Sequence, residues 1–177
     1  MVIYHCFKAG IGFQGLFHDL SKYSPSEFIP GAVYFQGNRS PNEGEREAAG
    51  FSKAWMHHKG RNKHHFEYWY DYDMVTKKIV PVDMPDRYIK EMCCDRIAAS
   101  KVYNKENYTT KSPLNYLQKS KKKKKMTETT YRKLLYLLTM LAEKGEKETL
   151  KRMRQMREIP KAVANSASDI ERNVSCE

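Results

Sequence analysis

Signals for the start of a helix recur along this chain, and they constrain its fold more than any other feature. Ser24 and Pro25 are followed by Glu27, so a serine cap, a proline at the first helical position and a capping-box glutamate stand in the order that opens a helix. The same order recurs in residues 40–43, and Thr127 is a further cap. The pattern predicts an all-α fold. We expect helices near residues 1–23, 24–29, 40–59, 63–72, 85–104, 127–144 and 146–158, and a hairpin or an extended loop at 73–83.

The composition is that of one ordinary globular domain. The chain has 177 residues, of which 40% are hydrophobic, so it can bury a core and is not expected to be globally disordered. No stretch approaches the roughly 20 apolar residues of a membrane-spanning helix, and the first residues do not have the pattern of a secretory signal. The four cysteines match neither a disulfide framework nor a zinc-thiolate pattern. We therefore expect a cytoplasmic protein that does not associate with membranes.

The net charge of +11 is concentrated in one segment. Lys119 and Lys121–Lys125 supply six of these positive charges. The remaining charge suits a protein that handles anions and does not require a face for binding duplex nucleic acid. The lysine run has two interpretations, a guide for nucleic acid and a solvated loop, and we favour the loop.

One candidate site begins at His18, where an imidazole and a carboxylate are adjacent in the sequence GLFHDLSKY. On a helix, His18 and Asp19 point about 100° apart, yet both can reach one ion near the helix surface. Lys22 shares that face. A cation beside a metal ion is useful when the ligand is a phosphate, because the two then divide its charge.

Asp95 is a second candidate, because it is the one acid on an otherwise core-facing stripe. On a helix it aligns with Tyr88, Met92, Ala99 and Tyr103. A buried carboxylate is costly unless it binds a metal ion, a cation or several hydrogen-bond donors. An internal salt bridge or a capped helix end is the alternative.

Two histidine pairs lie between these candidates. His58 falls on the buried stripe of its helix while His57 turns aside, and His64 and His65 lie on faces with neighbouring aromatic residues. A single buried histidine is usually a core residue, but four within nine residues indicate metal binding. The spacing does not decide which member of each pair is the ligand.

These residues resemble the HD-domain superfamily of metal-dependent phosphohydrolases, whose signature is a His, a His-Asp pair, further histidines and an Asp on a core helix. More narrowly, GLFHDLSKYSPSEF and WMHHKGRNKHHFEYW are similar to a bacterial and phage family of unknown function, some of whose members carry a catalase label. The resemblance covers roughly residues 4–105. A haem catalase is set aside because the sequence has no haem-attachment motif.

The resemblance implies an HD-like helical bundle that holds one or two divalent ions (Mn, Co, Zn, Mg or Fe). His18 and Asp19 match the paired ligands, Asp95 matches the terminal Asp, and Lys22 matches a lysine that meets the phosphate. The other implied ligands are His58 and His65, with His57 and His64 as substitutes and His5 as the first ligand, although His5 is closer to His18 than in most members. The implied organisation is an HD-like core at 1–105, a Lys-rich loop at 106–126, C-terminal helices packing on the core at 127–159 and a disordered tail at 160–177.

The function implied is hydrolysis of a nucleotide or another small phosphate ester by a metal-activated water, with Asp19 and Lys22 as the catalytic pair. Arg61, Asn62 and Lys63 are candidates for holding the phosphate, and an exposed polar turn is their alternative interpretation. Two other functions stay open. One is a di-iron oxygenase of the same fold, and the other is a non-catalytic protein that binds a nucleotide or a partner.

Overall fold

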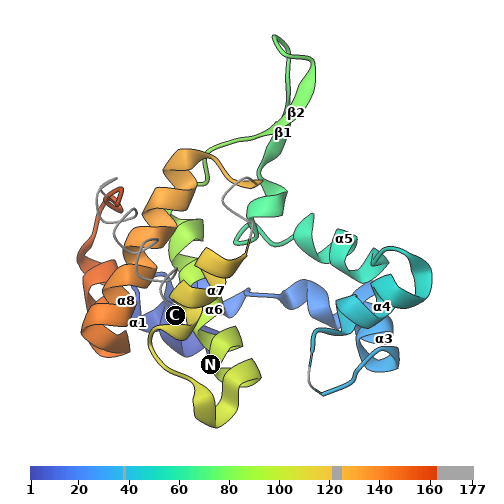
Figure 1. Ribbon diagram of the computed structural model, residues 1–177, viewed down its shortest axis with the longest axis horizontal. Helices are drawn as coiled ribbons and strands as arrows, with labels where there is room; N and C mark the ends of the chain where they lie inside the picture. The colour runs from blue at the N-terminus through green and yellow to red at the C-terminus, as the bar shows by residue number, and fades with distance from the viewer. Residues whose placement is uncertain (38, 121–124, 163–177) are drawn as a thin grey trace.

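The computed structural model describes residues 1–37, 39–120 and 125–162, and it is mostly helical (Figure 1). The coarse all-α expectation is thus confirmed, with one small hairpin as the exception. The α-helices are α1 (Val2–Lys8), α2 (Gly12–Leu16), α3 (Pro25–Val33), α4 (Pro41–Ala49), α5 (Lys53–Lys59), α6 (Asp86–Asn104), α7 (Ser112–Lys119) and α8 (Glu128–Gln155). The 3₁₀ helices are η1 (Leu20–Tyr23), η2 (Phe66–Tyr68) and η3 (Lys105–Asn107), and the strands are β1 (Tyr70–Asp73) and β2 (Lys78–Pro81).

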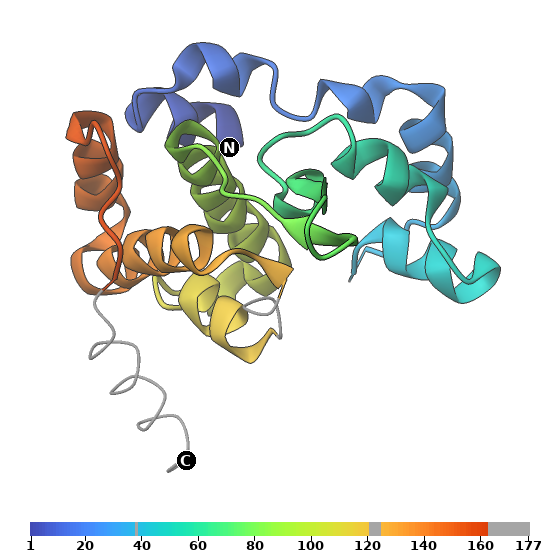
Figure 2. The same ribbon diagram turned by 90° about the horizontal axis from the view of Figure 1, so that it is seen from above.

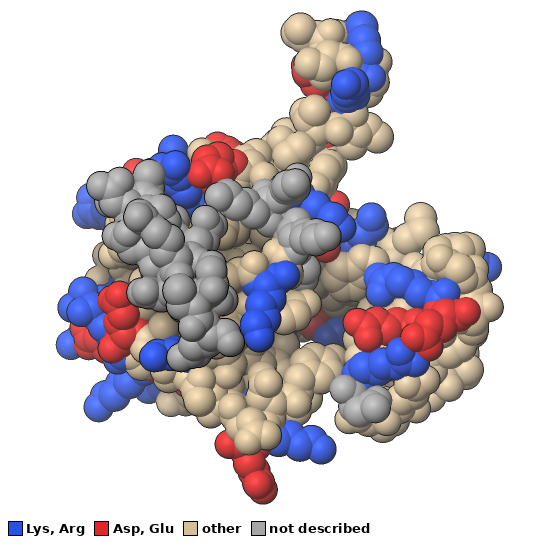
Figure 3. All heavy atoms as spheres, viewed as in Figure 1, with Lys and Arg blue, Asp and Glu red and all other residues tan. Residues whose placement is uncertain are grey.

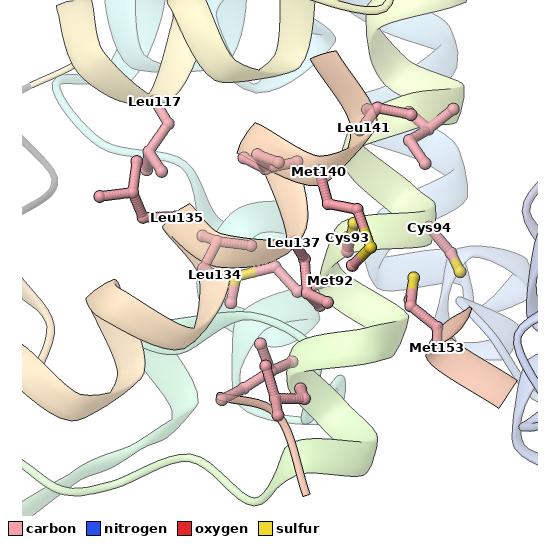
Figure 4. Packing of buried hydrophobic residues seen from close by; sticks show 14 of the residues in the cluster. Met92, Cys93, Cys94, Leu117, Leu134, Leu135, Leu137, Met140, Leu141 and Met153 are labelled. Atoms are coloured by element: carbon pink, nitrogen blue, oxygen red, sulfur yellow. The ribbon is translucent and has the colours of Figure 1, made fainter. Parts of the chain in front are cut away.

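Helices α1, α6, α7 and α8 form a body that contains the hydrophobic core. Helix α6 follows Pro85, and its apolar side chains pack against α8. Figure 4 shows this packing for Met92 and Cys93 of α6 and Leu137 of α8. The Thr127 side chain accepts a hydrogen bond from the Thr130 backbone N–H and caps α8, as expected. Gly145, at φ 74°, interrupts α8 with a sharp kink, so the second half of the helix returns over the body.

Helices α3, α4 and α5 form a separate side lobe (residues 25–59), which lies apart from the body in both views (Figures 1 and 2). Its helices pack on one another and on η1. None of the described residues between Gly12 and His65 belongs to the hydrophobic core cluster of the body. The lobe is therefore joined to the body by something other than a shared apolar core.

Local signals explain why several expected helix bounds are wrong. The single helix expected at 40–59 is two helices, because Gly50 adopts φ 80° and the Ser52 side chain caps α5. The helix expected at 63–72 is absent: η2 leads into a hairpin in which Tyr70 pairs with Pro81. The aromatic and β-branched residues there favour strands. Figure 1 shows this hairpin projecting from the body.

The expected loop at 106–126 contains α7, so that expectation is wrong for residues 112–119. Pro113 suits the first turn, and Leu114 and Leu117 are buried in the core. Lys121–Lys124 and most of the expected tail, residues 163–177, lie outside the described residues. No helix in the described part of the chain has the length and apolar character to cross a membrane.

The corner between α1 and α2 depends on a glycine. Gly15 is buried, and a Cβ atom there would overlap the Cys6 side chain of α1. We expect Gly15→Ala to lower the free energy of unfolding by about 1–3 kcal/mol, because a packed contact must open. Gly31→Ala in α3 is the control, since a Cβ atom there meets open space. Urea denaturation of both variants measures the effect, and equal midpoints would contradict it.

Candidate metal centre

Five segments bring histidines and carboxylates together between the body and the side lobe. The turn between α2 and η1 contributes His18 and Asp19, and α5 contributes His57 and His58. His64 and His65 follow α5, Glu91 and Asp95 belong to α6, and Glu27 belongs to α3. His18 and Asp19 were expected on a helix, but Asp19 adopts φ 57° in a turn. This left-handed conformation turns the chain sharply just where the pair of side chains enters the cluster.

Asp19 lies at the centre of the cluster and is buried. Its Oδ1 atom is 3.3 Å from His58 Nε2 and 3.5 Å from His64 Nε2. Its Oδ2 atom is 3.1 Å from His18 Nε2 and 2.5 Å from Lys22 Nζ. The two oxygens of one carboxylate therefore face two different sets of groups.

The remaining expected ligands lie around the same point. His18 Nε2 is 3.6 Å from Asp95 Oδ1, and His65 Nε2 is 2.8 Å from His58 Nε2. Potential ligand atoms lie within 4.8 Å of one another in three overlapping groups. These are Asp19, His58, His64 and His65; His18, Asp19 and Asp95; and His18, His64 and Glu91.

Glu91 is a functional candidate that the sequence analysis missed. Its Oε1 atom is 3.1 Å from His18 Nδ1 and 3.3 Å from His64 Nδ1, so one carboxylate faces the Nδ1 atoms of two rings. The Nε2 atoms of both rings are thereby directed toward Asp19. A carboxylate on the far nitrogen is the usual way in which proteins orient histidines that bind metals. Glu91 lies four residues before Asp95, and this shared helix face is the signal that points to it.

Glu27, also missed as a site residue, has the same relation to the next two histidines. Its oxygens lie 2.6 Å from His57 Nδ1 and 2.7 Å from His58 Nδ1. The sequence pattern assigned Glu27 to a capping box, yet the Ser24 side chain makes no capping hydrogen bond. The carboxylate is therefore used between helices, where it directs His58 Nε2 toward Asp19.

Three buried atoms of the cluster need a partner. His18 Nε2, Asp19 Oδ1 and His64 Nε2 are within ion-pair distance of other groups, but none has a hydrogen bond within the described part of the chain. Buried polar atoms are nearly always satisfied, so such a group calls for an explanation. Nitrogen and oxygen donors directed at one space fit a divalent metal ion.

The carboxylates of the cluster are held in their charged form. Burial opposes the protonation of His18, yet the surrounding carboxylates raise its pKa to about 11. Burial would raise the pKa of Glu91, but the neighbouring His18 and His64 lower it to about 2. The pKa of Asp95 is also lowered by His18, against the effect of burial. The cluster thus favours bound positive charge.

The other sequence-predicted residues are not all in the cluster. His5 is buried in α1, but its Nε2 atom lies 3.6 Å from Glu146 Oε2 of α8, and it joins none of the ligand groups. His57 contacts Glu27 and is also outside these groups. The turn at Gly10 (φ 82°) separates α1 from the His18 turn. The expected first ligand therefore lies against the body's helices.

The proposed phosphate-binding triplet does not face the cluster as a unit. Asn62 is buried, and its side-chain amide donates hydrogen bonds to Ser21 Oγ and the His58 carbonyl. Arg61 is exposed beside the His57 carbonyl, and Lys63 Nζ lies 5.7 Å from the centre of the Tyr68 ring. Asn62 thus fixes the end of α5, and of the expected phosphate contacts only Lys22 lies beside Asp19.

The cluster opens into a cavity of about 740 Å³ between the side lobe and α6. Figure 3 shows the molecule hollowed between these two parts. Asp19, Lys22, His58, His65 and Asp95 line it. A small molecule in this cavity would therefore reach the candidate ligands directly.

Comparison with known proteins gives one finding. A family model described as a family of unknown function (DUF5662) matches residues 1–140. Neither the curated proteins nor the solved structures contain a match.

Proposed function

We propose that this chain, which belongs to the DUF5662 family of unknown function, is a metal-dependent hydrolase of small phosphate esters. The observation that carries the proposal is the set of buried, unbonded atoms His18 Nε2, Asp19 Oδ1 and His64 Nε2 at the end of a cavity. The order of the His-Asp pair, the later histidines and Asp95 is also the order of the HD-domain signature.

The donors divide into two sets that share Asp19. His58 and His64 face its Oδ1 atom, whereas His18 faces its Oδ2 atom and also Asp95. Imidazole and carboxylate ligands suit Mn, Co, Zn and Fe, and the pairing allows one or two ions. Such an ion supplies Lewis acidity and lowers the pKa of a water molecule toward neutrality.

The reaction is the attack of water on the phosphorus atom of the ester. A new P–O bond forms to the water oxygen, the ester P–O bond breaks, and the proton lost by the water passes to the leaving alcohol. Glu27 and Glu91 keep the rings of His58 and His18 in place during this exchange. Lys22, whose side chain is 62% exposed, can meet a phosphoryl oxygen while it contacts Asp19.

Lys22→Ala is expected to lower the turnover of para-nitrophenyl phosphate by about 10- to 100-fold while the metal content stays at the wild-type level. The lysine stabilises charge on the phosphoryl oxygens and is not needed as a ligand. Release of para-nitrophenol from metal-loaded protein, together with elemental analysis, measures both quantities. Lys151→Ala, which removes an exposed lysine of α8, is the matched control.

The same assay separates the other functions. No hydrolysis by protein that carries its metal would contradict the proposal and favour a binding protein. Iron as the purified metal, with oxygen uptake and no release of phosphate, would favour the di-iron oxygenase. Unchanged turnover in Lys22→Ala would contradict the proposal that Lys22 stabilises charge on the phosphoryl oxygens.

A further inference from the structure

The cavity beside the metal centre has a second, apolar end. Phe28 and Phe35 of the side-lobe segment, Trp55 of α5 and Tyr103 of α6 line it, along with alanines. Phe28 is 62% exposed and Phe35 is 70% exposed. Aromatic side chains that are left open to a cavity in this way are typical of walls that contact a ligand.

The charges in the cavity limit what can bind there. Among the described residues that line it, Lys22 is the one lysine and there is no arginine, whereas Asp19, Glu27 and Asp95 are acidic. The negative charge of one phosphate group can be balanced by the metal ion and Lys22. A chain of phosphates would place further negative charge beside carboxylates without a cation to pair with it.

The far end of the cavity offers few polar partners. Outside the metal centre, the described lining residues with uncharged hydrogen-bonding side chains are Ser40, Asn42, Trp55 and Tyr103, and Asn42 Oδ1 already accepts a hydrogen bond from Ser52. A charged group there would find no oppositely charged side chain to pair with, because these partners are uncharged. A flat apolar group would instead contact Phe28, Phe35 and Trp55.

We infer that the substrate is a phosphate monoester whose alcohol part is uncharged and aromatic, bound with its phosphate at Lys22 and its ring against Phe28 and Phe35. This inference rests on the proposed function, since it assigns the class of ester. It narrows the expected nucleotide to a compound with a single phosphate. Polyphosphates are excluded from the class.

Calorimetric titration of metal-loaded protein with phenyl phosphate, methyl phosphate and ATP tests the inference. The affinity for phenyl phosphate is expected to be at least about 10-fold higher than the affinity for methyl phosphate, and also higher than the affinity for ATP. Phe35→Ala is expected to weaken phenyl phosphate binding about 5- to 10-fold and to leave methyl phosphate binding unchanged. Phe13→Ala is the matched control, since Phe13 is 77% exposed in α2 and does not line the cavity.

Equal affinities for phenyl and methyl phosphate, or tighter binding of ATP, would overturn the inference. An effect of Phe13→Ala equal to that of Phe35→Ala would also overturn it. Failure of the proposed function is distinguishable, because release of inorganic phosphate from phenyl phosphate is measured in a separate assay. Preferential binding of phenyl phosphate without hydrolysis would support the ligand class and contradict the proposed hydrolase. Hydrolysis of both esters without a difference in affinity would support the hydrolase and contradict the ligand class.

Discussion

Replacing Asp19 with alanine is expected to leave the purified protein without a bound metal ion. Both oxygens of this buried carboxylate face histidine Nε2 atoms, so the substitution removes a donor from both ligand sets at once. We expect the affinity for added Mn²⁺ or Zn²⁺ to fall by about 100-fold or more, beyond the loss that is usual for an orienting residue. Elemental analysis and calorimetric titration of the metal alone give the two readouts.

A graded series strengthens this experiment. His18→Ala and Asp95→Ala are also expected to lose the ion, whereas Glu91→Gln leaves the two ligand sets around Asp19 in place and should weaken binding by about 10- to 100-fold. Asp71→Ala, in the exposed hairpin, is the control for removing an aspartate. Wild-type metal stoichiometry in Asp19→Ala would contradict the proposed metal centre, and with it the proposed hydrolase.

The sequence was informative where a residue type was out of place in its own helix. Asp95 was singled out because it interrupts a core-facing stripe, and the structure places its carboxylate 3.6 Å from His18. Glu91 escaped notice because an acid between Lys90 and Met92 looks like an ordinary surface residue of an amphipathic helix. Its burial results from the packing of the His18 turn on α6, which is a long-range event that local periodicity does not report.

Competing local signals account for the other errors. Glu27 fitted a capping box, yet α5 lies across α3 and attracts its carboxylate to two histidines. His5 had the expected position in the order of ligands, but the turn at Gly10 places it against Glu146. Residues 63–72 are compatible with helical spacing because five of the ten are Phe, Tyr or Trp. Their strand preference prevails once Tyr70 pairs with Pro81.

The side lobe has few buried apolar side chains to hold it in position. None of its described residues joins the body's core cluster, and its buried side chains are mainly polar, such as Glu27, Glu45 and His58. Its aromatic and aliphatic residues are largely exposed. The closest polar contacts between this lobe and the His18 turn pass through His58 and Asp19, which belong to the candidate metal centre. Metal binding and the order of the lobe should therefore be coupled.

Removal of the metal by a chelator is expected to raise the amide hydrogen exchange of α3–α5 by up to about 1000-fold while α8 keeps its protection. A ligand at about 1000 times its Kd stabilises the state that binds it by about 4 kcal/mol, and the lobe has few apolar contacts to replace that contribution. Exchange measured by mass spectrometry with and without EDTA follows both regions in one sample. The buried leucines of α8, from Leu134 to Leu141, lie in the core and provide the internal reference.

Asp19→Ala separates coupling through the metal from a direct effect of the chelator. Because this variant is expected to lack the ion, its lobe should exchange rapidly with or without EDTA. Restoring metal to chelated wild-type protein should return the protection, which excludes irreversible damage. Equal loss of protection in α3–α5 and in α8 would show that the ion stabilises the whole molecule, and no loss in either would show that the lobe is held by its protein contacts alone.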